Sequence, residues 1–405
     1  MQRKLLLIFI AILLVVNVVP VQTVHAASGT TLVVNGKSAS LKGNIVIKDG
    51  VSYAPFREIF EALGATVTWI QEQQKAVGKT NSRQLGVTIG KSTASLTLGS
   101  TTTTINIKPP YLENNITYVP IRDVAEALGF EVRWDQQTKT IYVNVIPVVF
   151  VHGLNSSSGT FQEAISNFSN EFSQITHKIT IASNGTLSTQ KLVSGNVTSP
   201  LITIEFKDAS ASFYNQGVWI NRSADYISKE FGANKMDFVT HSMGGVAVTK
   251  HIVDTNGRYV NRLVTLGSPI NGSPAGNAAN LLLTYTTLRA VSLVVDTNAY
   301  RDLSLGSTAL QDIYSKRGNF PSHIKVFSYA GKINNTSSDG VVSVKSAFYL
   351  QNYTNNISCK RAIDVSHTNL QKNASVLSDV KKWLAGDPNI NGDGCSLYTA
   401  EKLFN

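Results

Sequence analysis

The residues with the clearest chemical potential lie in the stretch THSMGG, which has Ser242 at its centre. Met236–Val239 before it is short and apolar, as in a buried strand, and Val246–Val253 after it has helical spacing. The serine therefore lies at a sharp turn, where the two following glycines let strand and helix approach closely. The usual form of this turn begins with glycine, and here that place is taken by Thr240. The setting predicts a nucleophilic serine.

A nucleophilic serine needs a histidine base and an acid that orients the base. After a strand–serine–helix turn the chain order is serine, acid, histidine. His251 falls in the helix that follows Ser242, and His323 enters a predicted strand. His367 lies in a loop, IDVSHTNL, before a C-terminal helix, and we predict that it is the base.

The acid is chosen by the same order. Asp339 lies in the turn SDGVV after a predicted strand, at the edge where open α/β sheets build their sites. Asp302 and Asp312 lie in the intervening segment, and Asp364 is only three residues before His367. We predict that Asp339 is the acid.

The elements around these residues predict an α/β fold. Val145–Val151 is continuously apolar, as in a central parallel strand, and Leu263–Leu266 is another buried strand. Gly217–Gly232 is typical of an amphipathic helix that ends at its last glycine. Strands alternating with helices predict a mostly parallel sheet covered by helices on both faces.

Six motifs then occur in the order found in α/β-hydrolases: VFVHGLN, THSMGGVAV, LGSPINGS, DLSLGSTALQDI, SDGVVSVKSA and VSHTNL. Residues 147–385 resemble this family, and most of all a secreted branch of bacterial lipase-like proteins. The resemblance implies Ser242 as nucleophile, Asp339 as acid and His367 as base. It does not fix the substrate, and hydrolysis of carboxylic esters through an acyl-enzyme is the leading hypothesis for such a serine.

The loop HGLNSSS, which follows the first strand of this part, is expected to take part in the same reaction. In α/β-hydrolases it supplies one backbone N–H of the oxyanion hole, and the residue after the nucleophile supplies the other. By position these donors are Leu154 and Met243. His152 is expected to shape the loop rather than to act as a base.

Two further segments of this part leave alternatives open. The apolar stretch within residues 277–310 is either a lid over the site or a core helix. Near the C-terminus, DPNINGDG has calcium-loop spacing, but Tyr398 stands where the bidentate acid belongs. We therefore expect a polar turn there, with no metal and no cofactor.

An internal repeat precedes this part. VSYAPFREIFEALGATVTW at Val51–Trp69 matches ITYVPIRDVAEALGFEVRW at Ile116–Trp134, a shift of 65 residues. Each copy predicts a helix that begins at a proline and ends at a glycine, followed by an alternating strand. The repeat predicts a small α+β domain of two similar halves.

Residues 29–145 resemble the copper amine oxidase N-terminal-like (stalk) domain of secreted Gram-positive proteins. Residues 27–146 contain no His and no Cys, so no copper site is predicted. The resemblance implies a spacer, or a module that contacts the cell wall or envelope.

The N-terminus predicts export. Arg3 and Lys4 precede the apolar run LLLIFIAILLVV, and VHA offers a cleavage site before Ala27. The alternative is an uncleaved membrane anchor. In an exported chain the only two cysteines, Cys359 and Cys395, are expected to form a disulfide, the alternative being two separate thiols. The formal charge of +10 comes from scattered Lys and Arg, which argues against nucleic acid as a partner.

Together these features predict a signal peptide (residues 1–26), a stalk-like domain (29–145), an α/β-hydrolase domain (146–385) and a tail (386–405). We predict a secreted or cell-surface serine hydrolase, a lipase or esterase acting on an ester or lipid substrate. Two alternatives are an acyltransferase acting on an envelope component and a non-catalytic surface-binding protein.

Overall fold

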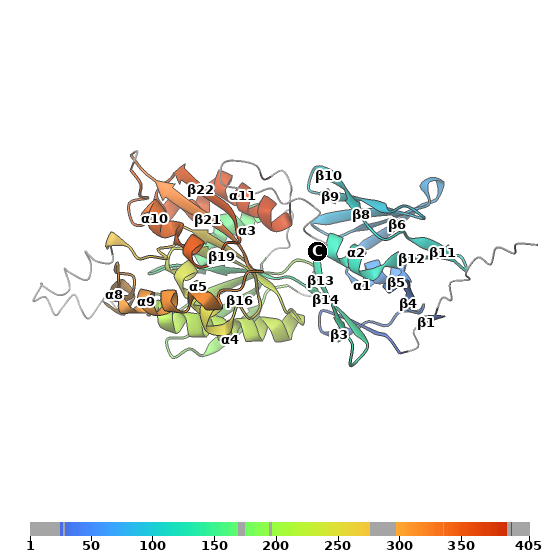
Figure 1. Cartoon of the computed structure of the whole chain (residues 1–405), viewed down its shortest axis with the longest axis horizontal. Helices are drawn as coiled ribbons and strands as arrows, with labels where there is room; N and C mark the ends of the chain where they lie inside the picture. Colours follow the sequence, from blue (N-terminus) through green and yellow to red (C-terminus); the bar gives the residue numbers. More distant parts are fainter. Residues whose placement is uncertain are drawn as a thin grey trace, which may run out of the picture.

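The computed structural model describes residues 25–26, 29–168, 175–193, 197–275, 297–334, 336–386 and 390. Two modules contact each other (Figure 1): the N-terminal module, residues 29–145, and the C-terminal module, residues 146–386.

The described residues of the N-terminal part form fourteen strands, two α-helices and one short 3-10 helix (Gln71–Gln73). The strands are β1 (His25–Ala26), β2 (Thr31–Val34), β3 (Lys37–Ser38), β4 (Val46–Lys48), β5 (Val51–Pro55), β6 (Thr66–Ile70), β7 (Lys75–Lys79), β8 (Arg83–Thr88), β9 (Thr93–Leu98), β10 (Thr101–Asn106), β11 (Tyr111–Glu113), β12 (Ile116–Pro120), β13 (Phe130–Asp135) and β14 (Thr140–Val145). The helices are α1 (Phe56–Ala62) and α2 (Ile121–Ala127).

The two halves of the repeat pair with each other through equivalent residues. β12 runs antiparallel to β5, with Val119 opposite Ala54, its counterpart in the other copy. In each half a helix and then a strand follow, and the tryptophan of that strand donates a hydrogen bond to a glutamine two residues later. Trp69 Nε1 donates to Gln71, and Trp134 Nε1 donates to Gln136, both at 2.7 Å. The predicted α+β domain of two similar halves is therefore present.

The C-terminal module is built on one eight-stranded sheet with the strand order β17-β16-β18-β15-β19-β20-β21-β22. Its strands are β15 (Val148–Val151), β16 (Ile175–Ile181), β17 (Leu187–Lys191), β18 (Leu201–Phe206), β19 (Met236–His241), β20 (Val260–Leu266), β21 (Lys325–Lys332) and β22 (Ile357–Asp364). Its helices are α3 (Gln162–Phe168), α4 (Phe213–Phe231), α5 (Met243–Thr255), α8 (Thr297–Asp302), α9 (Thr308–Ser315), α10 (Val344–Ala347) and α11 (Ala374–Ala385). Only the edge strand β17 pairs antiparallel.

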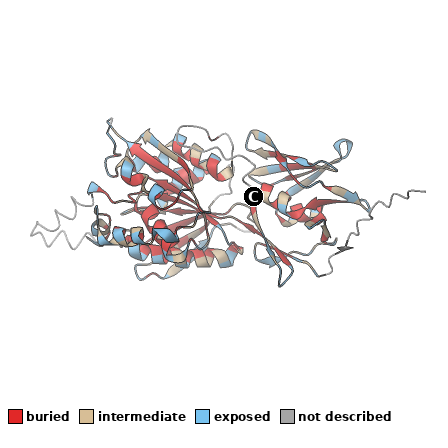
Figure 2. Ribbon diagram, viewed as in Figure 1, coloured by how far each residue is buried: buried red, intermediate tan, exposed pale blue. Residues whose placement is uncertain are grey.

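Helices cover both faces of this sheet, as predicted. α4 and α5 lie on one face, and α3 and α11 on the other (Figure 1). Successive residues of β15 point to opposite faces of the sheet. Val149 packs in the core with α4 and α5, and Phe150 packs in the core with α3 and α11. Figure 2 shows the buried residues concentrated in the sheet and on the helix faces that meet it.

One strand prediction needs correction. Val145–Val151 was expected to be one central strand, but Val145 ends β14 of the N-terminal module and β15 begins at Val148. Pro147 lies between them and has no N–H to donate to a ladder. The apolar run is therefore shared by two sheets, although β15 is central in its own, as predicted.

The N-terminal module packs against the N-terminal ends of the parallel strands. Ser82 Oγ lies 3.4 Å from Ser199 Oγ, just before β18, and Lys235 Nζ lies 3.8 Å from Glu131 Oε1, just before β19. Arg83 donates to the carbonyl of Ala385 at the end of α11, at 3.1 Å. The carboxyl ends of the strands lie on the opposite side of the C-terminal module.

Several sequence predictions fall outside the described residues. They are the leader (apart from His25–Ala26), most of the apolar stretch in 277–310, Cys395 and the calcium-like residues Asp387, Asn389, Asn391 and Gly392. Cys359 is buried in β22, and its disulfide with Cys395 stays a prediction. Among the described residues, no helix combines the length and apolarity needed to cross a bilayer.

A buried histidine makes the fold sensitive to acid. His251 in α5 is 1% exposed, and its Nε2–H donates to the carbonyl of Arg258 at 3.2 Å. Burial disfavours the charged ring and lowers its pKa to about 4. In the unfolded chain the pKa is about 6.5. Between these values the unfolded chain binds a proton that the folded chain does not, so stability falls as the pH falls from about 6.5 to 4.

We predict that His251→Gln reduces the loss of stability on acidification. The wild-type chain should lose up to about 3 kcal/mol through this residue between pH 7 and pH 4. Urea unfolding at several pH values measures the slope. His323→Gln is the matched control because His323 is exposed and should leave the slope unchanged. Equal slopes for the wild type and His251→Gln would contradict the prediction.

Candidate active site

Ser242, the predicted nucleophile, lies at the turn between β19 and α5. Its backbone has φ 52° and ψ −129°, a conformation that residues with a side chain rarely adopt. Its N–H donates to the carbonyl of Leu266 at 3.0 Å, and its carbonyl accepts from Gly245 at 3.1 Å. These bonds hold the turn, and the serine remains partly accessible.

The residues around the turn leave no room for larger side chains. A β-carbon at Gly244 would lie 2.5 Å from the carbonyl oxygens of Val151 and His152. Thr240, where the usual pattern has glycine, is fully buried and donates its hydroxyl to the carbonyl of Val264 at 2.7 Å. Threonine is tolerated there because its polar group has a partner on the neighbouring strand β20.

The structure brings the three predicted catalytic residues into one hydrogen-bonded line. His367 Nε2 lies 2.9 Å from Ser242 Oγ, and His367 Nδ1 lies 2.8 Å from Asp339 Oδ2. A second bond joins the last two residues, because the N–H of His367 donates to the carbonyl of Asp339 at 3.0 Å. With a carboxylate at Nδ1, the proton of the neutral ring belongs on Nδ1, and Nε2 is left as an acceptor for the hydroxyl.

The carboxylate of Asp339 is buried and fixed. Asp339 is 2% exposed, and its Oδ1 accepts the N–H groups of Val341 at 2.9 Å and Val342 at 2.7 Å. Gly267, at the end of β20, makes room for the acid–base pair. A β-carbon there would lie 3.1 Å from Asp339 Oδ2 and 3.2 Å from His367 Nδ1.

A second histidine supports His367, and the sequence analysis did not identify it. The rings of His241 and His367 lie 4.9 Å apart between centroids. Burial, together with the neighbouring His367, lowers the pKa of His241 to about 3, so the ring is neutral. Its Nε2 lies 3.0 Å from the carbonyl of His367 and therefore donates a hydrogen bond there. The signal available was its position directly before the nucleophile.

The loop proposed for the oxyanion hole lies against the nucleophile. A β-carbon at Gly153 would lie 2.7 Å from Ser242 Cβ, so the chain just before Leu154 contacts the serine. Met243 is the first residue of α5, where backbone N–H groups have no partner within the helix. Both predicted donors are thus neighbours of Ser242.

His152 shapes this loop, as expected. It is fully buried, and burial lowers its pKa. Phe206 N–H donates to its Nε2 at 3.1 Å, which leaves the proton on Nδ1, where it is donated to the carbonyl of Gly153 at 2.9 Å. Both nitrogens are therefore engaged, and neither contacts Ser242.

The other candidate acids and bases lie elsewhere. His251 bonds to Arg258, and His323 is exposed before β21. The carboxylate of Asp302 accepts from Ser212, and that of Asp312 pairs with Lys316 at 2.8 Å. Asp364 is exposed at the end of β22.

The described end of the proposed lid segment lies near the oxyanion loop. Tyr300 in α8 accepts a hydrogen bond from Asn155, the residue after Leu154, at 3.2 Å. In the part of the chain that the structure describes, no group of three or more His, Cys, Asp or Glu side chains is arranged to hold a metal ion.

Solved structures of bacterial proteins are similar in fold to part of this chain. The product of gene lin2722 from Listeria innocua is 19% identical, with a TM-score of 0.49, over 63% of this chain and 99% of that one. The mature form of lipase BlEst2 from Bacillus licheniformis is 19% identical, with a TM-score of 0.42, over 59% of this chain and 91% of that one.

Two family descriptions match the chain. Residues 33–143 match the copper amine oxidase N-terminal domain. Residues 135–387 match the α/β hydrolases of unknown function called DUF915. Because the second match spans more than half of the chain, and the mostly parallel sheet has the expected α/β-hydrolase architecture, the protein belongs to this α/β-hydrolase family.

Proposed function

We propose that the protein is a secreted serine ester hydrolase of the lipase or esterase type. The observation that carries this proposal is the line of hydrogen bonds from Ser242 through His367 to Asp339, with distances of 2.9 and 2.8 Å. A nucleophile, a base and an acid in that order are the parts that acyl transfer to serine requires.

The reaction follows from the positions of these groups. Ser242 Oγ attacks the ester carbonyl while His367 Nε2 takes the hydroxyl proton. The negative charge that develops on the carbonyl oxygen is stabilised by the N–H groups of Leu154 and Met243. His367 then gives its proton to the leaving alcohol, and an acyl-enzyme remains.

Water completes the cycle. His367 takes a proton from water, the hydroxide attacks the acyl carbonyl, and the proton returns to Ser242 Oγ as the carboxylic acid leaves. Asp339 holds the ring in the required tautomer and stabilises the charged imidazolium in both halves of the reaction.

Apolar side chains near the site favour a substrate with an apolar acyl group. Leu305 is 46% exposed and Val341 is 36% exposed. Ser273, in the loop after β20, joins their two segments, because its N–H donates to Leu303 at 2.8 Å and its hydroxyl donates to the carbonyl of Val341 at 2.5 Å. Val341 is also two residues from Asp339.

The N-terminal module acts in this proposal as a spacer or envelope-binding unit. It contacts the C-terminal module where the parallel strands begin, whereas Ser242 follows the end of β19. None of the proposed catalytic residues belongs to it. Export rests on the basic and apolar N-terminal sequence.

We predict that a fluorophosphonate probe labels the full-length protein at Ser242, because it reacts with serines activated by a neighbouring base. Ser242→Ala should abolish both labelling and hydrolysis of p-nitrophenyl esters. Mass spectrometry of the labelled peptide identifies the modified residue. Labelling at another serine, or none in folded protein, would argue against the proposal.

We predict that Asp339→Asn lowers kcat on a soluble ester by roughly 10³–10⁴. The amide keeps the shape but favours the wrong tautomer of His367 and removes the negative charge beside it. Asp364→Asn is the matched control, because Asp364 is exposed and should retain most activity. A loss of less than about tenfold in Asp339→Asn would show that another group is the acid.

We predict that His241 is a positioning residue for His367. His241→Phe keeps a ring beside His367 but loses the N–H donor, so kcat should fall by about five- to tenfold, the effect of one hydrogen bond, with little change in KM. His241→Gln keeps a donor and should recover part of the rate with an unchanged acid limb of the pH profile. Equal rates for the Phe and Gln variants would indicate that only packing matters.

A further inference from the structure

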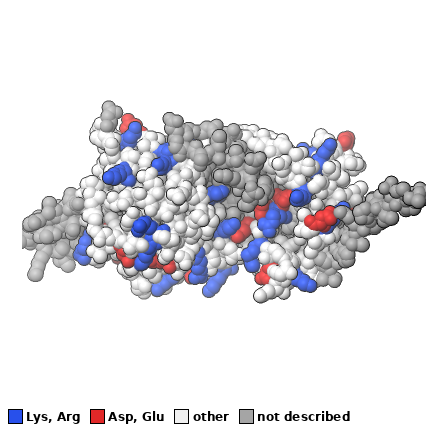
Figure 3. Space-filling view, in the orientation of Figure 1, with Lys and Arg blue, Asp and Glu red and all other residues white. Residues whose placement is uncertain are grey.

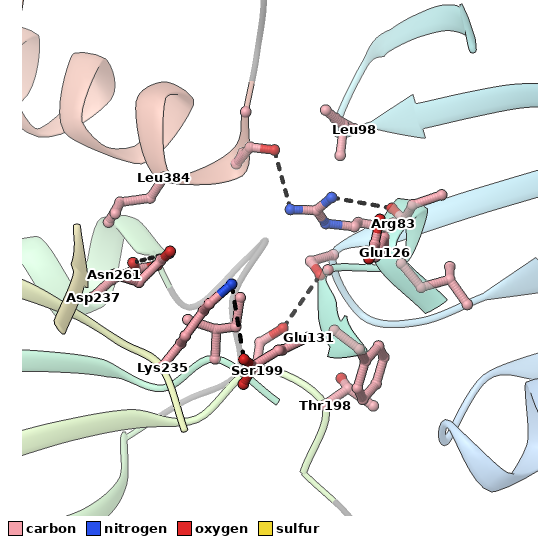
Figure 4. A pocket seen from close by; sticks show the side chains of 18 of the residues that line it. Arg83, Leu98, Glu126, Glu131, Thr198, Ser199, Lys235, Asp237, Asn261 and Leu384 are labelled. Carbon is pink, nitrogen blue, oxygen red and sulfur yellow. Dashed lines mark hydrogen bonds and ion pairs between the residues drawn. The ribbon is translucent and has the colours of Figure 1, made fainter. Parts of the chain in front are cut away.

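A cavity of about 340 Å³ lies between the two modules. We call it the inter-module cavity; its wall includes Arg83, Glu131, Thr198, Lys235 and Arg262. Figure 4 shows Arg83 reaching in from the N-terminal module, with Lys235 and Asp237 on the opposite side. Because it lies where the parallel strands begin, it is separate from the catalytic residues at their carboxyl ends.

Positive side chains outnumber carboxylates on this wall. The cations are Arg83, Arg122, Lys235, Arg262 and Lys325, and the carboxylates are Glu126, Glu131 and Asp237. Figure 3 shows Lys and Arg interspersed with Asp and Glu around the junction of the modules. The described residues of the cavity wall therefore carry an excess of positive charge.

Each carboxylate already has a cation of its own. Arg262 binds both oxygens of Asp237, at 2.9 and 2.5 Å. Arg122 lies 2.9 Å from Glu126, and Lys235 lies 3.8 Å from Glu131. Among the described residues, Arg83 has no carboxylate within ion-pair distance.

The partners of Arg83 use only part of its hydrogen-bonding capacity. Its guanidinium donates to two backbone carbonyls, that of Ala127 at 3.0 Å and that of Ala385 at 3.1 Å. Each helix end carries about half an elementary charge, so the two ends together offset much of the guanidinium's charge, but they accept from only two of its five N–H donors. Burial and the neighbouring Arg262 lower the pKa of Arg83 to about 10, which leaves it charged at neutral pH.

Hydroxyl groups line the same cavity as this cation. Ser82 and Ser199 line the cavity with their hydroxyls 3.4 Å apart. The hydroxyl of Thr198 is buried and has no partner among the described residues. A half-buried cation and hydroxyl groups that line the same cavity are groups that can bind an oxyanion.

We propose that the inter-module cavity binds a small phosphorylated ligand through its phosphate group, with Arg83 as the main charge partner. Guanidinium presents paired N–H groups that match two oxygens of a phosphate, and the hydroxyls complete the contacts. The volume is in the range of small-molecule sites and exceeds the needs of phosphate alone, so the ligand carries a further small group as well. Such a ligand would join the two modules.

The test measures binding to the full-length protein by isothermal titration calorimetry. The probes are inorganic phosphate, sulfate and glucose 6-phosphate, with chloride at matched ionic strength as the blank. Saturable binding of one equivalent is expected, tightest for the phosphate ester. Equal affinity for phosphate and the ester would assign the site to free phosphate, whereas no saturable binding of any probe would overturn the proposal.

Variants locate the site. Arg83→Gln should weaken binding by at least about tenfold, as expected for losing a charge-assisted contact. Arg57→Gln is the matched control, because Arg57 belongs to the same module but is 57% exposed and outside the cavity wall. Unchanged affinity in folded Arg83→Gln protein would overturn the proposal.

A measurement on the wild-type chain tests the site even if the Arg83→Gln variant does not fold. Phenylglyoxal modifies arginine, and peptide mass spectrometry reports each site separately. Glucose 6-phosphate at saturation should slow the modification of Arg83 and leave that of Arg57 unchanged. Equal modification of Arg83 with and without the ligand would show that the cavity does not hold it. Ester hydrolysis plays no part in this readout, so its result is independent of the proposed function.

Discussion

The strained backbone of Ser242 is the constraint on which the site depends. A residue with φ 52° and ψ −129° stays in that conformation only where its neighbours enforce it. Here the carbonyl of Leu266 takes its N–H, and α5 begins at the next residue. Because α5 starts so early, Gly244 passes in contact with the backbone after β15. The nucleophile and the loop that carries Leu154 are therefore fixed by one set of contacts.

The parallel sheet has two ends with different roles: the carboxyl ends of its strands and their N-terminal ends. Strands β19, β20 and β21 run in one direction, so the loops that follow them gather at one edge, where Ser242, Gly267 and Asp339 meet. The same strands begin at the other edge, where the N-terminal module and the inter-module cavity lie. The chemistry of one edge can thus be separate from recognition at the other.

The sequence predicted the elements and the meeting of the three residues well, because local patterns and chain order carry that information. The helix after Ser242 and the strand before it are strongly apolar, and their turn needs small residues. It failed at Val145–Val151, where apolarity alone does not reveal that Pro147 separates two sheets. It also missed His241 and the cavity around Arg83. The cavity joins residues far apart in the chain and shows no motif, and the contact of His241 with the distant His367 cannot be read from its place beside Ser242.

The three histidines near the nucleophile show why residue type alone does not set a role. His152 and His241 are buried without a carboxylate partner, so burial lowers the pKa of each, and each serves as a neutral donor to a backbone carbonyl. His367 instead has a carboxylate on one nitrogen and a hydroxyl on the other. Only that combination lets a ring take a proton from serine and stabilise the resulting charge. The partners of each ring decide its role, and the fold determines those partners. His241 ends β19, and His152 lies in the loop after β15. The loop after β22 brings His367 to the acid that follows β21.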